Sequence, residues 1–104
     1  MRMRISGKPV IRDGKIAEFC RRHRIRRLAL FGSVLGPEFR PDSDIDVLVE
    51  FEAGHTPGLA FFQIEEELSR LLGRKVDLNT AGFLSPRIRE KVQAEAEVLF
   101  GPRR

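Results

Sequence analysis

The 104-residue chain contains no tyrosine, no tryptophan and a single cysteine, Cys20. A lone cysteine cannot close a disulfide within the chain, so we expect a reducing compartment, the cytoplasm. No apolar run approaches the ~18–20 residues that a membrane-spanning helix needs. The basic N-terminus lacks the apolar stretch of a signal peptide. These absences argue against a disulfide-stabilised secreted scaffold and against a membrane protein.

The composition that remains is ordinary for a globular protein, with 41% hydrophobic and 33% charged residues. A chain of this length fits one domain and can bury roughly two-thirds of the surface that its unfolded form exposes. We therefore expect a single domain over residues 1–104, in which residues 1–10 could form a flexible N-terminal segment.

The net charge of +4 is unevenly distributed along the chain. Residues 1–27 carry +8, residues 28–67 carry −8 and residues 68–104 carry +4. An acidic segment attracts metal ions, and basic segments attract phosphates. The basic N-terminal third leaves open a role as a nucleic-acid-binding module, although its charges need not share one face.

Apolar residues at helical spacing predict amphipathic helices over residues 13–23 and 61–72. Gly73 suits the C-cap of the second helix. Ser85 and Pro86 are typical of an N-cap and a first helical position, which predicts a third helix to about residue 96.

Short apolar or alternating runs between these helices predict four strands. They cover residues 25–31, 45–51, 75–79 and 97–100, and the first is apolar on both faces, as a central strand would be. Strands that alternate with helices predict an α/β domain with a small mixed sheet flanked by helices.

Two acidic residues stand at the start of the strand predicted for residues 45–51. Asp44 and Asp46 are two positions apart, so their side chains leave the same face roughly 6–7 Å apart. Such a pair suits Mg²⁺, which binds through a few carboxylates completed by phosphate oxygens and water. Two metal ions about 3.5–4 Å apart would orient the attacking and leaving oxygens of a phosphoryl displacement. Asp77, whose neighbours would face the core, could share the metal or take the proton from an attacking hydroxyl.

Gly32 and Ser33 follow the predicted central strand. A glycine lets the backbone approach phosphate oxygens closely, and a following helical turn would aim N–H groups at them. Taken singly, Gly-Ser is usually a turn, and Asp-x-Asp on a strand is usually a solvated edge. Their occurrence in one order, followed by a strand with a further aspartate, favours a phosphate and metal site.

That order resembles the nucleotidyltransferase superfamily of the DNA polymerase β type. The segments L-F-G-S-V-L (30–35) and R-P-D-S-D-I-D-V-L-V-E-F (40–51) are more closely similar to the minimal nucleotidyltransferases, small prokaryotic proteins that comprise little beyond the catalytic palm domain. The likeness extends from about residue 16 to residue 100.

The resemblance implies a role for each matching residue. The catalytic and magnesium-binding carboxylates would be Asp44, Asp46 and Asp77. The nucleotide would be bound by Gly32, Ser33, Arg40 and Ser43. One position departs from the pattern, because close relatives usually carry an arginine where this chain has Gly36.

The resemblance also implies an activity and a partner. Proteins of this group are similar to antitoxins that use ATP and Mg²⁺ to transfer AMP onto a tyrosine of a helical HEPN-type toxin. This chain has no tyrosine and no room for an acceptor domain, so the acceptor would belong to a partner protein. Nucleic acid is not expected as the direct substrate. The alternative is a catalytically weak antitoxin of the same fold that neutralises its partner by binding alone.

Three other side chains are expected to be structural. Cys20 lies at helical spacing with Phe19, with no His or acid partner in the sequence pattern, so we expect a core position. His23 lies beside the same apolar stripe. Of Phe61 and Phe62, one must point partly outward and could contribute to an interface.

Overall fold

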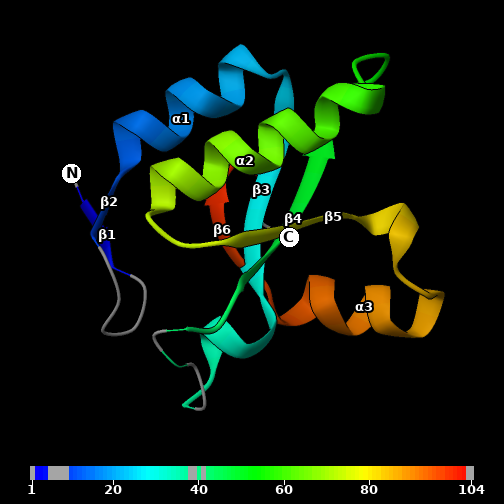
Figure 1. The fold of residues 1–104 in the computed structure, drawn as a ribbon. Helices are drawn as coiled ribbons and strands as arrows, with labels where there is room; N and C mark the ends of the chain where they lie inside the picture. Colours follow the sequence, from blue (N-terminus) through cyan, green and yellow to red (C-terminus); the bar gives the residue numbers. More distant parts are fainter. Residues whose placement is uncertain (1, 5–9, 38–39, 41, 103–104) are drawn as a thin grey trace.

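The computed structural model describes residues 2–4, 10–37, 40 and 42–102, with the backbone alone for residues 2–4, 10–13, 33 and 83. Its main sheet contains four strands in the order β5-β4-β3-β6 (Figure 1). The strand β4 pairs antiparallel to β3 and parallel to β5, and β6 pairs antiparallel to β3. The strands are β3 (Ile25–Phe31), β4 (Ile45–Phe51), β5 (Val76–Thr80) and β6 (Glu97–Phe100). This arrangement confirms the predicted mixed sheet and the central position of β3.

Three α-helices flank the sheet, α1 (Asp13–Arg22), α2 (Phe61–Leu72) and α3 (Pro86–Glu95). Figure 1 shows α1 and α2 on one side of the sheet and α3 on the other. The predicted ends are confirmed within a residue or two: Gly73 adopts a φ of 72° after α2, and the Ser85 hydroxyl accepts the Ile88 N–H before α3. Short 3-10 helices occupy Gly32–Leu35 (η1), Gly58–Ala60 (η2) and Ala81–Phe83 (η3).

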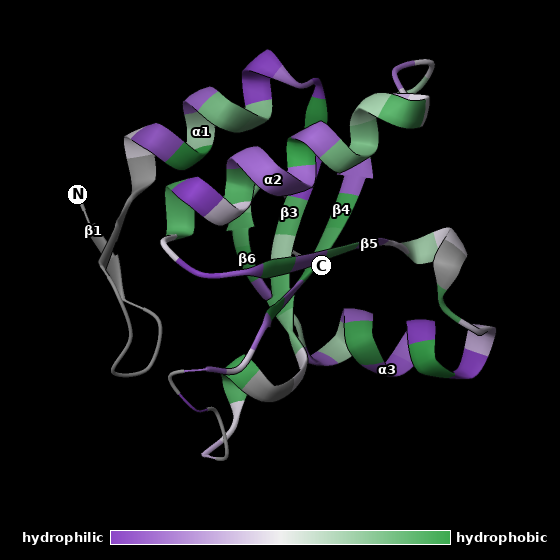
Figure 2. Cartoon of the chain, viewed as in Figure 1, coloured by the Kyte–Doolittle hydropathy of each residue, from purple (hydrophilic) through white to green (hydrophobic). Residues whose placement is uncertain are grey.

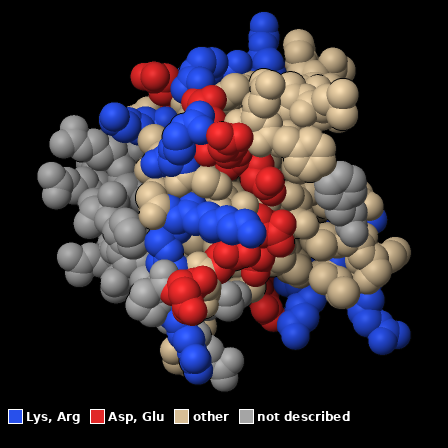
Figure 3. Space-filling model, in the orientation of Figure 1, with Lys and Arg blue, Asp and Glu red and all other residues tan. Residues whose placement is uncertain are grey.

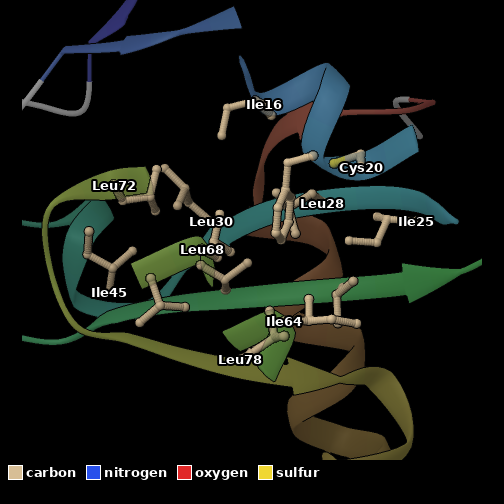
Figure 4. Close-up of a cluster of buried hydrophobic side chains, with 14 of the residues drawn as sticks. Ile16, Cys20, Ile25, Leu28, Leu30, Ile45, Ile64, Leu68, Leu72 and Leu78 are labelled. Carbon is tan, nitrogen blue, oxygen red and sulfur yellow. The ribbon is translucent and has the colours of Figure 1, made fainter. Parts of the chain in front are cut away.

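The hydrophobic core lies between the sheet and the α1–α2 layer (Figure 4). Strand alternation sends one set of side chains to this layer, and the apolar stripe of each helix meets them. Figure 2 shows β3 and β4 as hydrophobic along most of their length. The fully buried members of the core include Ile16, Phe19, Cys20, Leu28, Leu30, Val47, Val49 and Leu68. Cys20 is thus a core residue, as predicted, and burial raises the pKa of its thiol to about 12.

The first strands form a hairpin that the sequence patterns do not indicate. Arg2–Arg4 (β1) pairs antiparallel with Val10–Arg12 (β2), with Met3 opposite Ile11. Both strands fall within or beside the segment expected to be flexible, and the remaining residues of that segment, 1 and 5–9, lie outside the described part of the chain. None of the helices in the described ranges is long and apolar enough to cross a membrane.

Candidate active site

The three predicted carboxylates lie at one end of the sheet. Asp77 of β5 stands directly beside Asp46 in the parallel pairing of β4 with β5. Asp44 comes two residues before Asp46, just ahead of β4. Asp46 and Asp77 leave the face opposite the α1–α2 layer, because core residues occupy the neighbouring positions of both strands. Asp44 lies near enough for its charge to act on Asp46.

The surroundings of Asp46 disfavour its charged form. Burial raises the pKa of the Asp46 carboxyl above its ordinary value, and the negative charges of Asp77 and Asp44 raise it further. Lys75 places its Nζ 3.9 Å from the Asp44 Oδ2, and both of these side chains are largely exposed. Concentrated negative charge at a half-buried position is favourable for binding a cation.

Gly32 brings the chain directly against Asp46. It ends the central strand with a φ of +77° and opens the 3-10 turn η1. A Cβ at this position would lie 2.4 Å from the Asp46 Oδ2, closer than atoms can approach. The backbone pairing agrees, since Phe31 stands opposite Asp46 in the β3–β4 ladder. Only glycine combines this backbone conformation with this contact.

The segment that leads into Asp44 is a turn held by Arg74. The Arg40 N–H donates to the Ser43 hydroxyl at 3.1 Å, and the Ser43 N–H donates to the Arg40 carbonyl at 3.0 Å. The Arg74 guanidinium donates to the carbonyls of Arg40 and Ser43 at 2.8 and 2.6 Å. The predicted residues Arg40 and Ser43 are therefore parts of one turn beside the acidic cluster. The backbone of Ser33 follows Gly32 in η1, and its side chain lies outside the described part of the structure.

Sequence reasoning missed Arg74 and Lys75. Their position in the sequence could have indicated them, since these two consecutive cations directly precede the strand that carries Asp77. Figure 3 shows how the charges are distributed on the surface. Acidic side chains run along the middle of the face that carries α2 and β5, with basic side chains among and beside them.

The donor chemistry of the cluster fits magnesium. Three carboxylates are the hard oxygen ligands that Mg²⁺ prefers, and this ion commonly takes its remaining ligands from phosphates and water. Among the described residues, no three His, Cys, Asp or Glu side chains are close enough together to hold a metal ion by themselves.

Three arginines at the end of α1 and in the first half of β3 are paired within the fold. Arg27 is buried and donates to Glu50 at 3.1 Å, while Arg26 donates to the other oxygen of the same carboxylate at 2.9 Å. Arg22 pairs with Glu67 of α2. These three arginines are therefore engaged within the fold, and the nucleic-acid alternative stays a prediction.

The other side chains judged structural are placed as expected. His23 packs edge-on against Phe19, with ring centroids 4.9 Å apart, and its Nε2 lies 2.9 Å from the Glu67 Oε1. Burial alone would raise the pKa of Glu67, but hydrogen bonds from His23 and Arg22 outweigh it and lower this pKa. Phe62 is the outward member of its pair, with 65% of its surface exposed.

Comparison with known proteins decides the family. The nucleotidyltransferase domain family matches residues 14–99, which include every carboxylate of the cluster and the Gly32 turn. The chain belongs to the nucleotidyltransferase domain family. This confirms the resemblance and the enzyme class that the motifs predicted.

This nucleotidyltransferase is similar to proteins with more specific descriptions. It is 39% identical over 79 residues to protein adenylyltransferase MntA of Thermococcus cleftensis, covering 75% of this chain and 78% of that protein. A solved structure described as a minimal nucleotidyltransferase is 42% identical and superposes with a TM-score of 0.68, over 81% of this chain and 85% of the other. A third likeness, at 25% identity and a TM-score of 0.62, is to a complex of tri-AMPylated Shewanella oneidensis HEPN toxin with MNT antitoxin, covering 86% of this chain and 70% of the other.

Proposed function

We propose that this nucleotidyltransferase uses Mg²⁺ and ATP to transfer AMP to a hydroxyl of a partner protein, a tyrosine of an HEPN-type toxin, and so acts as an antitoxin. The observation that carries the proposal is the contact of Gly32 with Asp46, beside Asp77. This contact sets the backbone turn at Gly32 against two of the carboxylates, an arrangement that supports binding of phosphate and metal together.

The partner follows from the likeness to known complexes and from the composition. A structural neighbour is an MNT antitoxin bound to an AMPylated HEPN toxin, and a relative carries the name of a protein adenylyltransferase. The chain itself has no tyrosine, so a tyrosine acceptor must come from another protein.

In this reaction the acceptor hydroxyl attacks the α-phosphorus of ATP. The new oxygen–phosphorus bond forms as the bond to the β-phosphate breaks, so AMP is transferred and pyrophosphate leaves. Magnesium, when bound, would neutralise phosphate charge and lower the barrier to displacement. Asp44, Asp46 and Asp77 are the residues that would hold it.

The chain's own groups position the substrate and accept the proton. The N–H groups that follow Gly32 in η1 are the donors proposed to contact the triphosphate. Asp77 is exposed beside Asp46 and is proposed to take the proton from the attacking hydroxyl. Positioning and neutralisation of charge are expected to supply most of the catalysis.

Intact mass spectrometry tests the proposal. The purified protein is incubated with ATP, Mg²⁺ and an HEPN-type toxin as the candidate partner, and the mass of that toxin is followed. We expect adenylyl additions on the partner that require Mg²⁺ and map to tyrosine. Their abolition by Asp46→Asn, with the complex intact by size-exclusion chromatography, would separate transfer from binding.

The same experiment distinguishes the binding-only alternative. That alternative predicts no added mass on the partner and full inhibition of the toxin by Asp44→Ala and Asp46→Ala variants. Its motivation lies in the sequence, at Gly36, where the family resemblance implies an arginine near the nucleotide. Inhibition that persists without any transferred AMP would contradict the enzymatic proposal.

A further inference from the structure

Strand β5, which carries Asp77, lies at the edge of the sheet, and among the described strands only β4 pairs with it. Its pairing with β4 uses alternate N–H groups, so the N–H groups in between point away from the sheet. An outward N–H at an edge ordinarily bonds to water or to another strand. Here the outward groups of Val76 and Leu78 have partners of a different kind.

Two side chains of helix α2 accept these outward N–H groups. The Val76 N–H donates to the Ser69 hydroxyl at 3.0 Å, and the Leu78 N–H donates to the Glu65 carboxylate at 2.8 Å. The two acceptors are one helical turn apart, and they are linked because the Ser69 hydroxyl donates to the Glu65 carbonyl at 2.9 Å. Helix α2 therefore takes the place of a missing neighbouring strand along β5.

The two bonds flank one residue of the candidate site. Asp77 lies between Val76 and Leu78, so the backbone on both sides of it is fixed to α2. In the parallel ladder of β4 with β5, Asp77 stands directly beside Asp46. The bonds to α2 therefore fix the backbone of β5 at the position that sets this carboxylate beside Asp46.

We propose that Glu65 and Ser69 are positioning residues for nucleotide transfer, which hold Asp77 in register beside Asp46 by binding the outward N–H groups of β5. Neither residue needs to touch the nucleotide or the metal for this role. The inference deepens the proposed function and rests on it, because Asp77 matters only when the carboxylate cluster is used.

Variants at Glu65 separate the hydrogen bond from the charge. Glu65→Ala removes the acceptor, whereas Glu65→Gln retains an oxygen that can accept the Leu78 N–H. Glu66→Ala is the matched control, because Glu66 lies on the same helix, is exposed and pairs only with Arg70 among the interactions described for it. Ser69→Ala removes the acceptor of the Val76 N–H and is the test variant to use if Glu65→Ala does not fold.

Amide hydrogen exchange of the full chain, measured by NMR, reads the contact directly. We expect the Leu78 amide to exchange about tenfold faster in Glu65→Ala, as the loss of a hydrogen bond to a charged group implies, and at the normal rate in Glu65→Gln and Glu66→Ala. Titration with Mg²⁺ is expected to shift the Asp77 amide signal, and the shift should require several-fold more Mg²⁺ in Glu65→Ala.

The kinetics of AMP transfer measure the effect of these variants on catalysis. In Glu65→Ala the kcat for AMP transfer to the partner should fall about tenfold, with the KM for ATP nearly unchanged, and Glu65→Gln should restore it. Unchanged Leu78 exchange would overturn the contact, and faster exchange with normal kcat and normal Mg²⁺ response would overturn the positioning role. A wild-type protein that transfers nothing and does not respond to Mg²⁺ would instead refute the proposed function, and the positioning role with it.

Discussion

The position of Asp46 depends on the absence of a side chain at residue 32. The carboxylate occupies the space that a Cβ of residue 32 would need, and the positive φ of Gly32 sets the direction in which η1 leaves the central strand. Two properties of glycine are thus used at one position, and a substitution there affects both.

We predict that Gly32→Ala lowers the rate of AMP transfer about a hundredfold, because a displacement of about 1 Å in a catalytic group can cost this much. Gly54→Ala is the matched control: Gly54 has a similar φ of +80°, with nothing within 4 Å of an added Cβ. Both variants strain the backbone, but only Gly32→Ala displaces Asp46. Rates measured at saturating ATP would contradict this account if the two variants lost activity equally.

The raised pKa of Asp46 also predicts a cost in stability. Burial first, and then the charges of Asp77 and Asp44, disfavour the charged form of Asp46 in the folded protein. A carboxyl whose pKa is higher in the folded than in the unfolded chain destabilises the fold where it is charged. The destabilisation begins as the pH rises through the ordinary Asp value of 3.8 and is complete above the folded pKa.

Asp46→Asn is therefore expected to raise the melting temperature of the metal-free protein at neutral pH while it abolishes transfer. The difference in melting temperature should shrink as the pH falls toward the ordinary Asp value, where both proteins are uncharged at this position. Mg²⁺ should stabilise the wild type and not the variant. Thermal melts at several pH values, with and without Mg²⁺, test this, and a variant less stable than the wild type at neutral pH would contradict it.

At the scale of elements, local patterns predicted most of the fold. Helix α2 has an apolar stripe and a glycine C-cap, and β4 alternates strictly at its start, so each carries its own signal within a few residues. The gathering of Asp46 and Asp77 was predicted too, because the core-facing neighbours of each fix its face. The roles of these residues in catalysis stay predictions.

Features that depend on contacts between distant segments left no local signal. The β1–β2 hairpin contains three arginines among its six residues and resembles a flexible basic tail in sequence. The hydrogen bonds of Glu65 and Ser69 to β5 join residues seven to thirteen positions apart, in different elements. On a helical wheel both residues appear only as polar positions beside an apolar stripe.

At the scale of the whole molecule, folding brings together the basic and acidic segments that are separate along the sequence. The basic first third and the acidic middle of the chain come together, so that β3 and β4 lie side by side with opposite charges paired across them. The most buried of these pairs joins Arg27 to Glu50, with 3% and 19% of their side chains exposed. Arg27 is also tied to the end of the chain, since its Nε donates to the Pro102 carbonyl at 3.2 Å.

This burial leads to a prediction about stability. Glu50→Ala leaves the Arg27 guanidinium buried without its carboxylate, and removal of one partner of a buried ion pair costs about 3–5 kcal/mol. Glu52→Ala is the control from two positions further along the chain, where the pair with Arg24 spans 3.6 Å and both side chains are exposed. About 0–1 kcal/mol should be lost there. Urea unfolding with an unchanged m-value measures both free energies. Equal small losses would mean that water replaces the carboxylate at Arg27, and that the opposite charges of the two chain segments contribute little to holding β3 against β4.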